Sequence, residues 1–205
     1  MRSNPLYGFL LRAALWLPPC FAVWFLAAEF LTWPANWLAG EILHHLFPGF
    51  VNATDIGKGM LNVSTTLLPP GETVVARNQW IGMDFEVNSL IPGYGLPLFV
   101  ALSLATAGAR GIGKILLGAL LLLPPQVWGI CFVFLQNVAI TGGPYIAAQV
   151  GFSGLQREAV ALGYQFGSLI FPSLAPVVIW LAMNRKFLGA IMLEGLLNRE
   201  ARQFR

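Results

Sequence analysis

Charged residues are scarce in this chain. They make up 10% of its 205 residues, whereas hydrophobic residues make up 57% and the mean hydropathy is +0.69. Soluble domains carry roughly 25% charged residues, and a globule of this size cannot hide so much apolar surface. The composition argues against a soluble enzyme, a nucleic-acid-binding protein and a disordered chain. It predicts an integral membrane protein with one compact set of spans.

Cysteine and histidine are nearly absent as well. Cys20 and Cys131 both lie within apolar runs, so we interpret them as buried small hydrophobic residues rather than as a disulfide or a nucleophile. The two histidines, His44 and His45, lie within reach of Glu41 on a helix and form a candidate polar or metal cluster. A zinc site needs three or four ligands, and no remote cysteine or histidine completes this set. We therefore expect a polar helix face, with no metal and no cofactor.

Apolar runs predict four transmembrane helices. A spanning helix needs about 20 apolar residues, which the first and third runs provide easily and the second and fourth provide marginally. The predicted segments are residues 1–31 (a short tail and the first span), 91–107, 115–140 and 166–183. The first run lacks a small-x-small cleavage site, so we interpret it as an uncleaved anchor rather than a signal peptide.

The basic residues are distributed unevenly between the predicted loops. A cytoplasmic N-terminus places nine of the twelve basic residues inside and only Lys58, Arg77 and Arg157 outside. By the positive-inside rule, both termini are expected to be cytoplasmic. The remaining segments are then a periplasmic segment at 32–90, a cytoplasmic loop at 108–114, a periplasmic loop at 141–165 and a cytoplasmic amphipathic tail at 184–205.

The hydrophobic period changes within the long periplasmic segment. Over residues 35–47 apolar side chains recur at helical spacing, which predicts an amphipathic helix lying on the membrane surface. Over residues 59–88 they alternate with period two around a turn at 69–72, which is followed by a β-branched stretch at 73–76, and this predicts a β-meander of about three strands. The polar face of the last strand carries Trp80, Asp84, Glu86 and Asn88. Because so small a sheet is marginal alone, we expect a partner or the bilayer surface to cover it.

The junction between this strand and the second span resembles a known family. Residues 86–98 read Glu-Val-Asn-Ser-Leu-Ile-Pro-Gly-Tyr-Gly-Leu-Pro-Leu, and Asn-Pro-Leu at 4–6 precedes the Pro-Pro pair of the first span. Together they resemble the exosortase H-associated membrane proteins over most of the chain. The resemblance implies a Gram-negative inner-membrane protein that accompanies an exosortase, an enzyme that processes C-terminally tagged secreted proteins. It carries over no catalytic residue.

Glycine and proline in this junction allow a backbone to approach a partner closely. We therefore add five junction residues to the polar residues of the strand as a predicted partner contact: Pro92, Gly93, Tyr94, Gly95 and Pro97. The alternative interpretation is a plain bend between a strand and a helix.

Three functions remain open from the sequence. The leading hypothesis is a non-catalytic accessory subunit of an exosortase-type sorting system, with membrane lipids and another integral membrane protein as partners and no nucleic acid. The second is a small transporter or lipid-handling protein, because prolines lie in or near every span and broken helices can line a transport site. The third is a membrane enzyme that uses His44, His45 and Glu41. The scarcity of ionisable groups at mid-depth argues against the second, and we expect no enzymatic activity.

Overall fold

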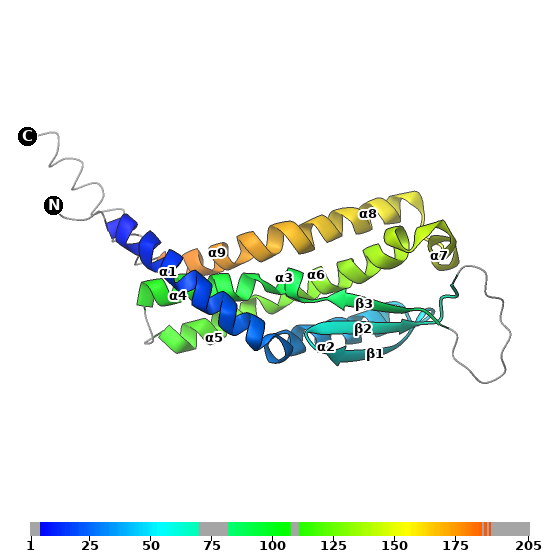
Figure 1. Cartoon of the computed structure of the whole chain (residues 1–205). Coiled ribbons are helices and arrows are strands. Elements are labelled where there is room, and N and C mark those ends of the chain that lie inside the picture. The colour runs from blue at the N-terminus through cyan, green and yellow to red at the C-terminus, as the bar shows by residue number, and fades with distance from the viewer. Residues whose placement is uncertain (1–4, 70–81, 108–110, 186, 188, 190–205) are drawn as a thin grey trace, which may run out of the picture. The chain divides into compact units, whose positions relative to one another are not determined.

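The structure is a computed structural model, which describes residues 5–69, 82–107, 111–185, 187 and 189 (Figure 1). The described chain is mostly helical and contains one small sheet. It divides into two compact units. Unit 1 comprises Met1–Leu26, Tyr94–Leu122 and Ser173–Arg205, and unit 2 comprises Ala27–Gly93 and Leu123–Pro172.

Unit 1 is built from apolar helices. They are α1 (Pro5–Leu26), α4 (Gly95–Ala107), α5 (Ile112–Leu121) and, from Ser173 onward, α9 (Phe171–Met183). The rings of Phe9 and Trp180 stack with centroids 5.1 Å apart, and Trp180 Nε1 donates a hydrogen bond to Thr106 Oγ1 over 3.0 Å. Gly118 lets α5 lie against Phe99, since a Cβ at this position would be 1.9 Å from the phenylalanine ring. Aromatic packing on small residues therefore holds this unit together.

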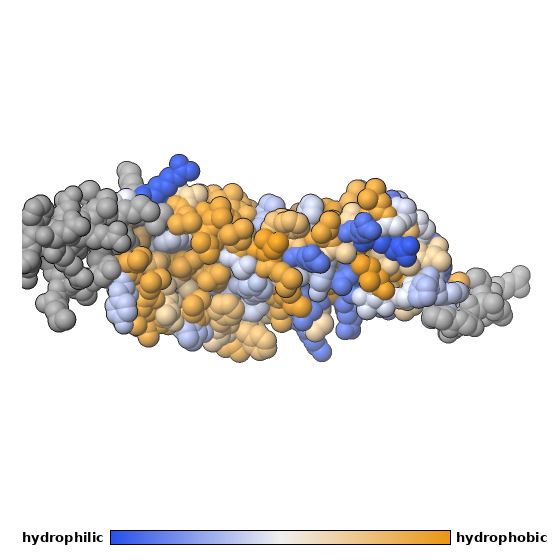
Figure 2. Space-filling view, turned by 90° about the horizontal axis from the view of Figure 1, so that it is seen from above, coloured by the Kyte–Doolittle hydropathy of each residue, from blue (hydrophilic) through white to orange (hydrophobic). Residues whose placement is uncertain are grey.

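Large apolar side chains remain exposed on these helices. On α1, Leu15 is 66% exposed, Phe25 66% and Leu26 85%. Figure 2 shows apolar side chains covering most of the face that it presents. Soluble monomers rarely carry apolar patches of this extent, whereas lipid-facing helices require them.

Within the described residues, three helices are long and apolar enough to cross a membrane: Leu6–Leu26, Ile112–Thr141 and Gly154–Met183. The apolar helix at Leu90–Thr106 is shorter. The described residues thus confirm a helical membrane protein with candidate spans near the first, third and fourth predicted runs. The predicted second span at 91–107 coincides with the shorter helix.

Unit 2 contains a three-stranded antiparallel sheet in the order β1-β2-β3. The strands are β1 (Val51–Gly57), β2 (Met60–Thr65) and β3 (Asp84–Asn88). The prediction of a small meander is confirmed, but its first strand lies earlier than expected. Only Val51 of β1 is buried and the next four residues are exposed, so this strand shows no period-two alternation. The predicted turn at 69–72, except Pro69, and the β-branched stretch at 73–76 lie outside the described residues, as does Trp80.

Two helices of unit 2, α2 (Ala28–Leu46) and α6 (Leu123–Gln136), cover the apolar face of the sheet. The other helices of this unit are α3 (Leu90–Gly93), α7 (Gly143–Val150) and α8 (Gly154–Gln165), with the π-helical segments η2 (Asn137–Thr141) and η3 (Phe166–Ile170). Leu43 of α2 and Phe134 of α6 belong to the same buried cluster as Leu61, Val63 and Val87 of the sheet. The expectation that a partner or the bilayer must cover the sheet is therefore wrong, because the chain supplies the cover itself.

Two predicted helix boundaries differ from the structure. The first apolar helix ends at Leu26, and α2 begins at Ala28 rather than at residue 35. Residues 28–31, which the sequence assigned to the first span, therefore belong to α2. Pro34 lies inside this helix rather than ahead of it. The predicted loop at 141–165 contains all of α7 and α8. Most of the predicted C-terminal tail lies outside the described residues.

Candidate partner-binding surface

The outer face of the sheet is polar and acidic. Phe85 and Val87 of β3 are buried, whereas Asp84, Glu86 and Asn88 are exposed. Strand register places Asp55 opposite Asn62 and Asn62 opposite Glu86, and Ser64 opposite Asp84. Because directly opposed residues share a face, these side chains form two adjacent rows. The outer sheet face, defined by Asp55, Asn62, Ser64, Asp84 and Glu86, therefore carries three carboxylates, and the three described strands contain no lysine or arginine.

Asn62 lies between two of these carboxylate positions. Its side-chain oxygen is buried and has no hydrogen-bond partner within the described residues. A buried polar atom without a partner is costly, so this part of the face has an unused hydrogen-bond acceptor.

A buried polar network ties the end of β3 to α2. The hydroxyl of Ser89 donates to the Asn36 side-chain oxygen, and the Asn36 amide reaches Thr32 Oγ1 at 3.5 Å. The Thr32 hydroxyl in turn donates to the Ala28 carbonyl over 2.8 Å. The side chains of Thr32, Asn36 and Ser89 are all buried. Asn88 also has a structural role, because its side-chain oxygen accepts from the Leu90 N–H over 3.0 Å at the start of α3.

The glycine-proline junction of the predicted contact lies mostly inside the molecule. Pro92, Gly93, Gly95 and Pro97 are buried, and Tyr94 is half-buried. A Cβ on Gly129 of α6 would be 2.4 Å from the Pro92 Cβ, so the proline ring occupies the space that glycine leaves open. Of the predicted contact residues within the described chain, the exposed ones that remain available to a partner are Asp84, Glu86 and Asn88.

Close helix packing surrounds this junction. A Cβ on Gly129 would lie 2.8 Å from the Gly167 carbonyl oxygen, and one on Gly167 would lie 2.6 Å from the Gly129 Cα. Gly163, four residues before Gly167, lies against Phe132, and its carbonyl accepts a hydrogen bond from Trp128 Nε1 over 3.0 Å. None of the sequence predictions above includes this contact. The Gly-x-x-x-Gly spacing at 163 and 167, which is typical of close membrane-helix packing, is the signal that reveals it.

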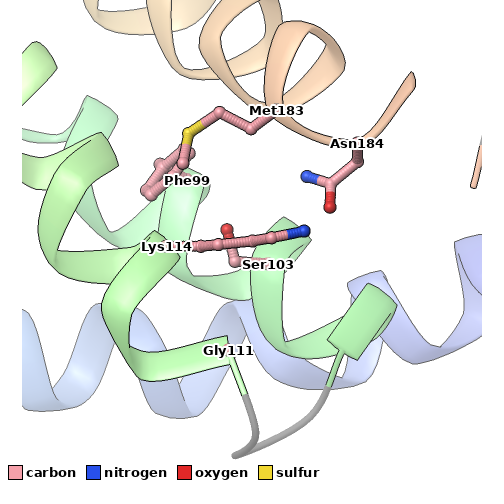
Figure 3. A pocket seen from close by; sticks show the side chains of 6 residues that line it. All are labelled: Phe99, Ser103, Gly111, Lys114, Met183 and Asn184. Carbon is pink, nitrogen blue, oxygen red and sulfur yellow. The ribbon is translucent and has the colours of Figure 1, made fainter. Parts of the chain in front are cut away.

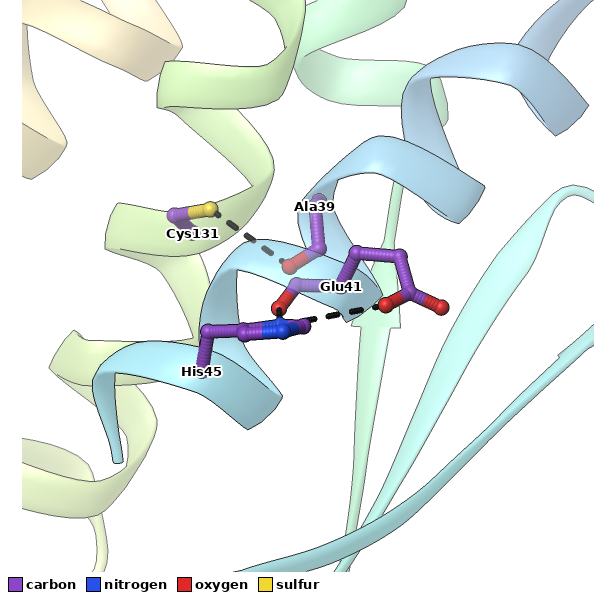
Figure 4. A network of polar contacts seen from close by, with 4 residues as sticks. All are labelled: Ala39, Glu41, His45 and Cys131. Atoms are coloured by element: carbon purple, nitrogen blue, oxygen red, sulfur yellow. Dashed lines mark hydrogen bonds and ion pairs between the residues drawn. The ribbon is translucent and has the colours of Figure 1, made fainter. Parts of the chain in front are cut away.

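The predicted Glu41, His44 and His45 cluster is exposed on α2. His45 Nδ1 lies 2.8 Å from the Glu41 carbonyl oxygen and 3.8 Å from Glu41 Oε2 (Figure 4). The rings of His44 and His45 are 6.1 Å apart and nearly perpendicular. Among the described residues, no group of three or more histidine, cysteine or acidic side chains is placed to hold a metal ion. The structure thus brings Glu41 and His45 together at the surface.

Cys131 is buried in unit 2, on the side of α6 that faces α2. Its Sγ lies 3.9 Å from the Ala39 carbonyl oxygen (Figure 4). It belongs to the same apolar cluster as Leu43 and Phe134. This cysteine is therefore a packing residue, as its apolar sequence context indicates.

Comparison with known proteins decides the family. The sequence profile of the exosortase H-associated membrane proteins matches residues 3–187, which is most of the chain. The chain belongs to this family. A search of curated proteins and a search of solved structures gave no match. The match to the exosortase H-associated membrane proteins includes the strand–helix junction on which the resemblance in the sequence depends, and it includes the outer sheet face.

Proposed function

We propose that this protein is a non-catalytic accessory subunit that accompanies exosortase H in the bacterial inner membrane. The observation that carries the proposal is the family match over residues 3–187, since the family is described by its association with exosortase H. The apolar helices with exposed leucine and phenylalanine side chains support a membrane location.

The distribution of charge supports four spans with both termini in the cytoplasm. Unit 1 holds nine basic and two acidic residues, a net charge of +7, whereas unit 2 holds three basic and seven acidic residues, a net charge of −4. This segregation is the one that the positive-inside rule produces when the loops of unit 1 are cytoplasmic and those of unit 2 are periplasmic. In this topology α1, α4, α5 and α9 take part in the four crossings, and the sheet lies in the periplasm.

Helix length supports the same topology. The helices Ile112–Thr141 and Gly154–Met183 have 30 residues each. At 1.5 Å per residue each is about 45 Å long, whereas the hydrocarbon core of a bilayer is about 30 Å thick. The polar residues Gln156, Arg157 and Glu158 are exposed on α8, at the end that would extend beyond the hydrocarbon. The extra length fits a periplasmic continuation of both helices.

The outer sheet face is the surface that we assign to the partner. The opposite, apolar face of the sheet is already packed against α2 and α6, so the exposed carboxylates of Asp55, Asp84 and Glu86 remain available to a partner. Anionic headgroups repel carboxylates, which disfavours the bilayer as the occupant of this face. A membrane protein with a complementary basic surface, which we take to be exosortase H, fits it better.

The proposal assigns no reaction to this chain. The polar side chains that the structure brings together serve packing, because Ser89 and Asn36 join a strand to a helix and Asn88 caps α3. The exposed Glu41–His45 contact is a helix-surface pair with one turn between its members. Neither arrangement calls for catalysis.

The test is co-purification with exosortase H from the native host in mild detergent. Glu86→Lys reverses one charge of the outer sheet face, and Glu158→Lys makes the same charge change at an exposed position of α8. We expect Glu86→Lys to reduce the recovered exosortase several-fold, while Glu158→Lys and membrane insertion of both variants stay at the wild-type level. Wild-type recovery with Glu86→Lys would reject the outer sheet face as the contact. Absence of exosortase from the wild-type eluate would reject the accessory role itself.

A further inference from the structure

Unit 1 contains a small pocket where three of its helices begin or end. Its volume is about 10 Å³, which is room for roughly one water-sized group. The lining residues come from α4, from the start of α5 and from the end of α9: Phe99, Ser103, Gly111, Lys114, Met183 and Asn184 (Figure 3). The apolar stretches Leu90–Thr106, Ile112–Thr141 and Gly154–Met183 all begin or end here, so the pocket lies at the depth of the headgroups in a membrane.

The pocket contains a buried polar side chain without a partner. Ser103 is 8% exposed, and within the described residues its hydroxyl makes no hydrogen bond. Asn184 is also 8% exposed, but its amide donates to the Trp180 carbonyl over 2.9 Å. The Ser103 hydroxyl lines the pocket, so it is available to donate a hydrogen bond to a group that enters.

The N-terminus of α5 also faces this pocket. Its N-cap is Gly111, which has no side chain to accept hydrogen bonds from the first turn of the ten-residue helix. The positive end of the helix dipole favours an anion here. Lys114 is in the same first turn, where a cation is unfavourable unless an anion accompanies it. In Figure 3 its ammonium group reaches toward the side chains of Ser103 and Asn184.

No carboxylate neutralises Lys114 within the described part of unit 1. This part contains Arg12, Lys114 and Arg185 and neither aspartate nor glutamate. A lysine ammonium and a serine hydroxyl thus line one small space at the N-terminus of a helix. These are the groups that bind phosphate oxygens in proteins.

We propose that this pocket binds the phosphate group of an anionic phospholipid. One phosphate oxygen enters the pocket and accepts a hydrogen bond from the Ser103 hydroxyl, while Lys114 and the positive end of the α5 dipole neutralise the charge. The acyl chains lie along the exposed apolar surface of α5, where Ile112 is 69% and Leu116 is 67% exposed. Free phosphate has the same oxygen chemistry, but the position of the pocket at the ends of apolar helices favours the lipid.

The test measures lipid bound to the purified full-length protein by native mass spectrometry. The probes are phosphatidylglycerol and, as the zwitterionic comparison, phosphatidylcholine. Lys114→Gln should lower phosphatidylglycerol binding about five-fold. A basic residue near an anionic surface contributes about 1 kcal/mol to binding, and this free energy corresponds to that factor. Ser103→Ala should lower it as well without changing the charge. Arg12→Gln is the matched control, because Arg12 is exposed, donates to the Gly8 carbonyl over 3.1 Å and does not line the pocket.

The proposal is supported if both pocket variants lose phosphatidylglycerol selectively, keep the wild-type melting temperature in detergent, and Arg12→Gln binds it normally. Equal binding of the two lipids by the wild type would overturn it, as would equal losses in Lys114→Gln and Arg12→Gln. Displacement of phosphatidylglycerol from the wild type by millimolar inorganic phosphate would reassign the site to free phosphate and overturn the lipid as its occupant.

Discussion

The hydroxyl of Ser89 donates a hydrogen bond to the side-chain oxygen of Asn36, and both side chains are almost fully buried. The two residues are 53 positions apart in the chain. The bond joins the end of β3 to the middle of α2, and the Asn36 amide continues it to Thr32. It is therefore one of the contacts that position the outer sheet face against its supporting helix.

Removal of this hydroxyl should destabilise unit 2. Ser89→Ala leaves the Asn36 oxygen buried without its donor, and an unsatisfied buried polar group costs about 1–3 kcal/mol. We expect a lower melting temperature in detergent. Ser64→Ala removes a partly exposed hydroxyl from the outer sheet face and should change stability by less than about 0.5 kcal/mol. Equal melting temperatures for the two variants would show that the buried bond contributes nothing to stability.

The crossing of α6 and η3 should not tolerate a methyl group. In Gly129→Ala the new Cβ would lie 2.4 Å from the Pro92 Cβ and 2.8 Å from the Gly167 carbonyl oxygen. Overpacking of this kind costs about 1–3 kcal/mol, which thermal unfolding in detergent would detect. Gly154→Ala is the control, since a Cβ there meets nothing within 4 Å. A Gly129→Ala variant as stable as Gly154→Ala would mean that the helices do not approach this closely.

Substitution of both histidines should leave the sorting pathway intact. His44 and His45 are exposed, and the polar contact of His45 is with Glu41 of the same helix. We expect His44→Ala combined with His45→Ala to support processing of an exosortase H substrate at the wild-type rate, measured by the appearance of the cleaved product in cells. A loss of processing with normal protein levels would return the membrane-enzyme hypothesis to consideration.

Labelling with a membrane-impermeant maleimide would test the proposed topology. In a background with Cys20→Ala and Cys131→Ala, we expect Asp55→Cys on the sheet to react in intact cells. Arg185→Cys, at the end of α9, should react only after the inner membrane is permeabilised. Both positions are exposed, so accessibility within the protein is matched. Reaction of Arg185→Cys in intact cells would place the C-terminal end of α9 in the periplasm, against the proposal.

Local patterns account for the parts of the fold that could be predicted. The first, third and fourth apolar runs predicted the regions of the three candidate spanning helices of the described chain. The alternation of Leu61 and Val63 in β2 and of Phe85 and Val87 in β3 predicted two strands and their buried faces. Strand β1 has one buried residue, Val51, followed by exposed ones, so no pattern in the sequence indicated it. Among the site residues, Asp84 and Glu86 were predicted on the exposed face for the same local reason.

The amino-acid sequence alone determined that this protein belongs in a membrane and which strand faces are polar, because composition and periodicity act over short stretches of chain. Its charge distribution is the basis of the orientation that we propose. Only the tertiary structure decided that α2 and α6 cover the sheet, that Pro92 packs on Gly129, and that Ser103 and Lys114 line one pocket. These outcomes depend on which distant residues meet. A proline, a serine or a glycine has the same local conformational preferences whether it is exposed or buried. Packing between remote segments of the chain determines whether it is buried.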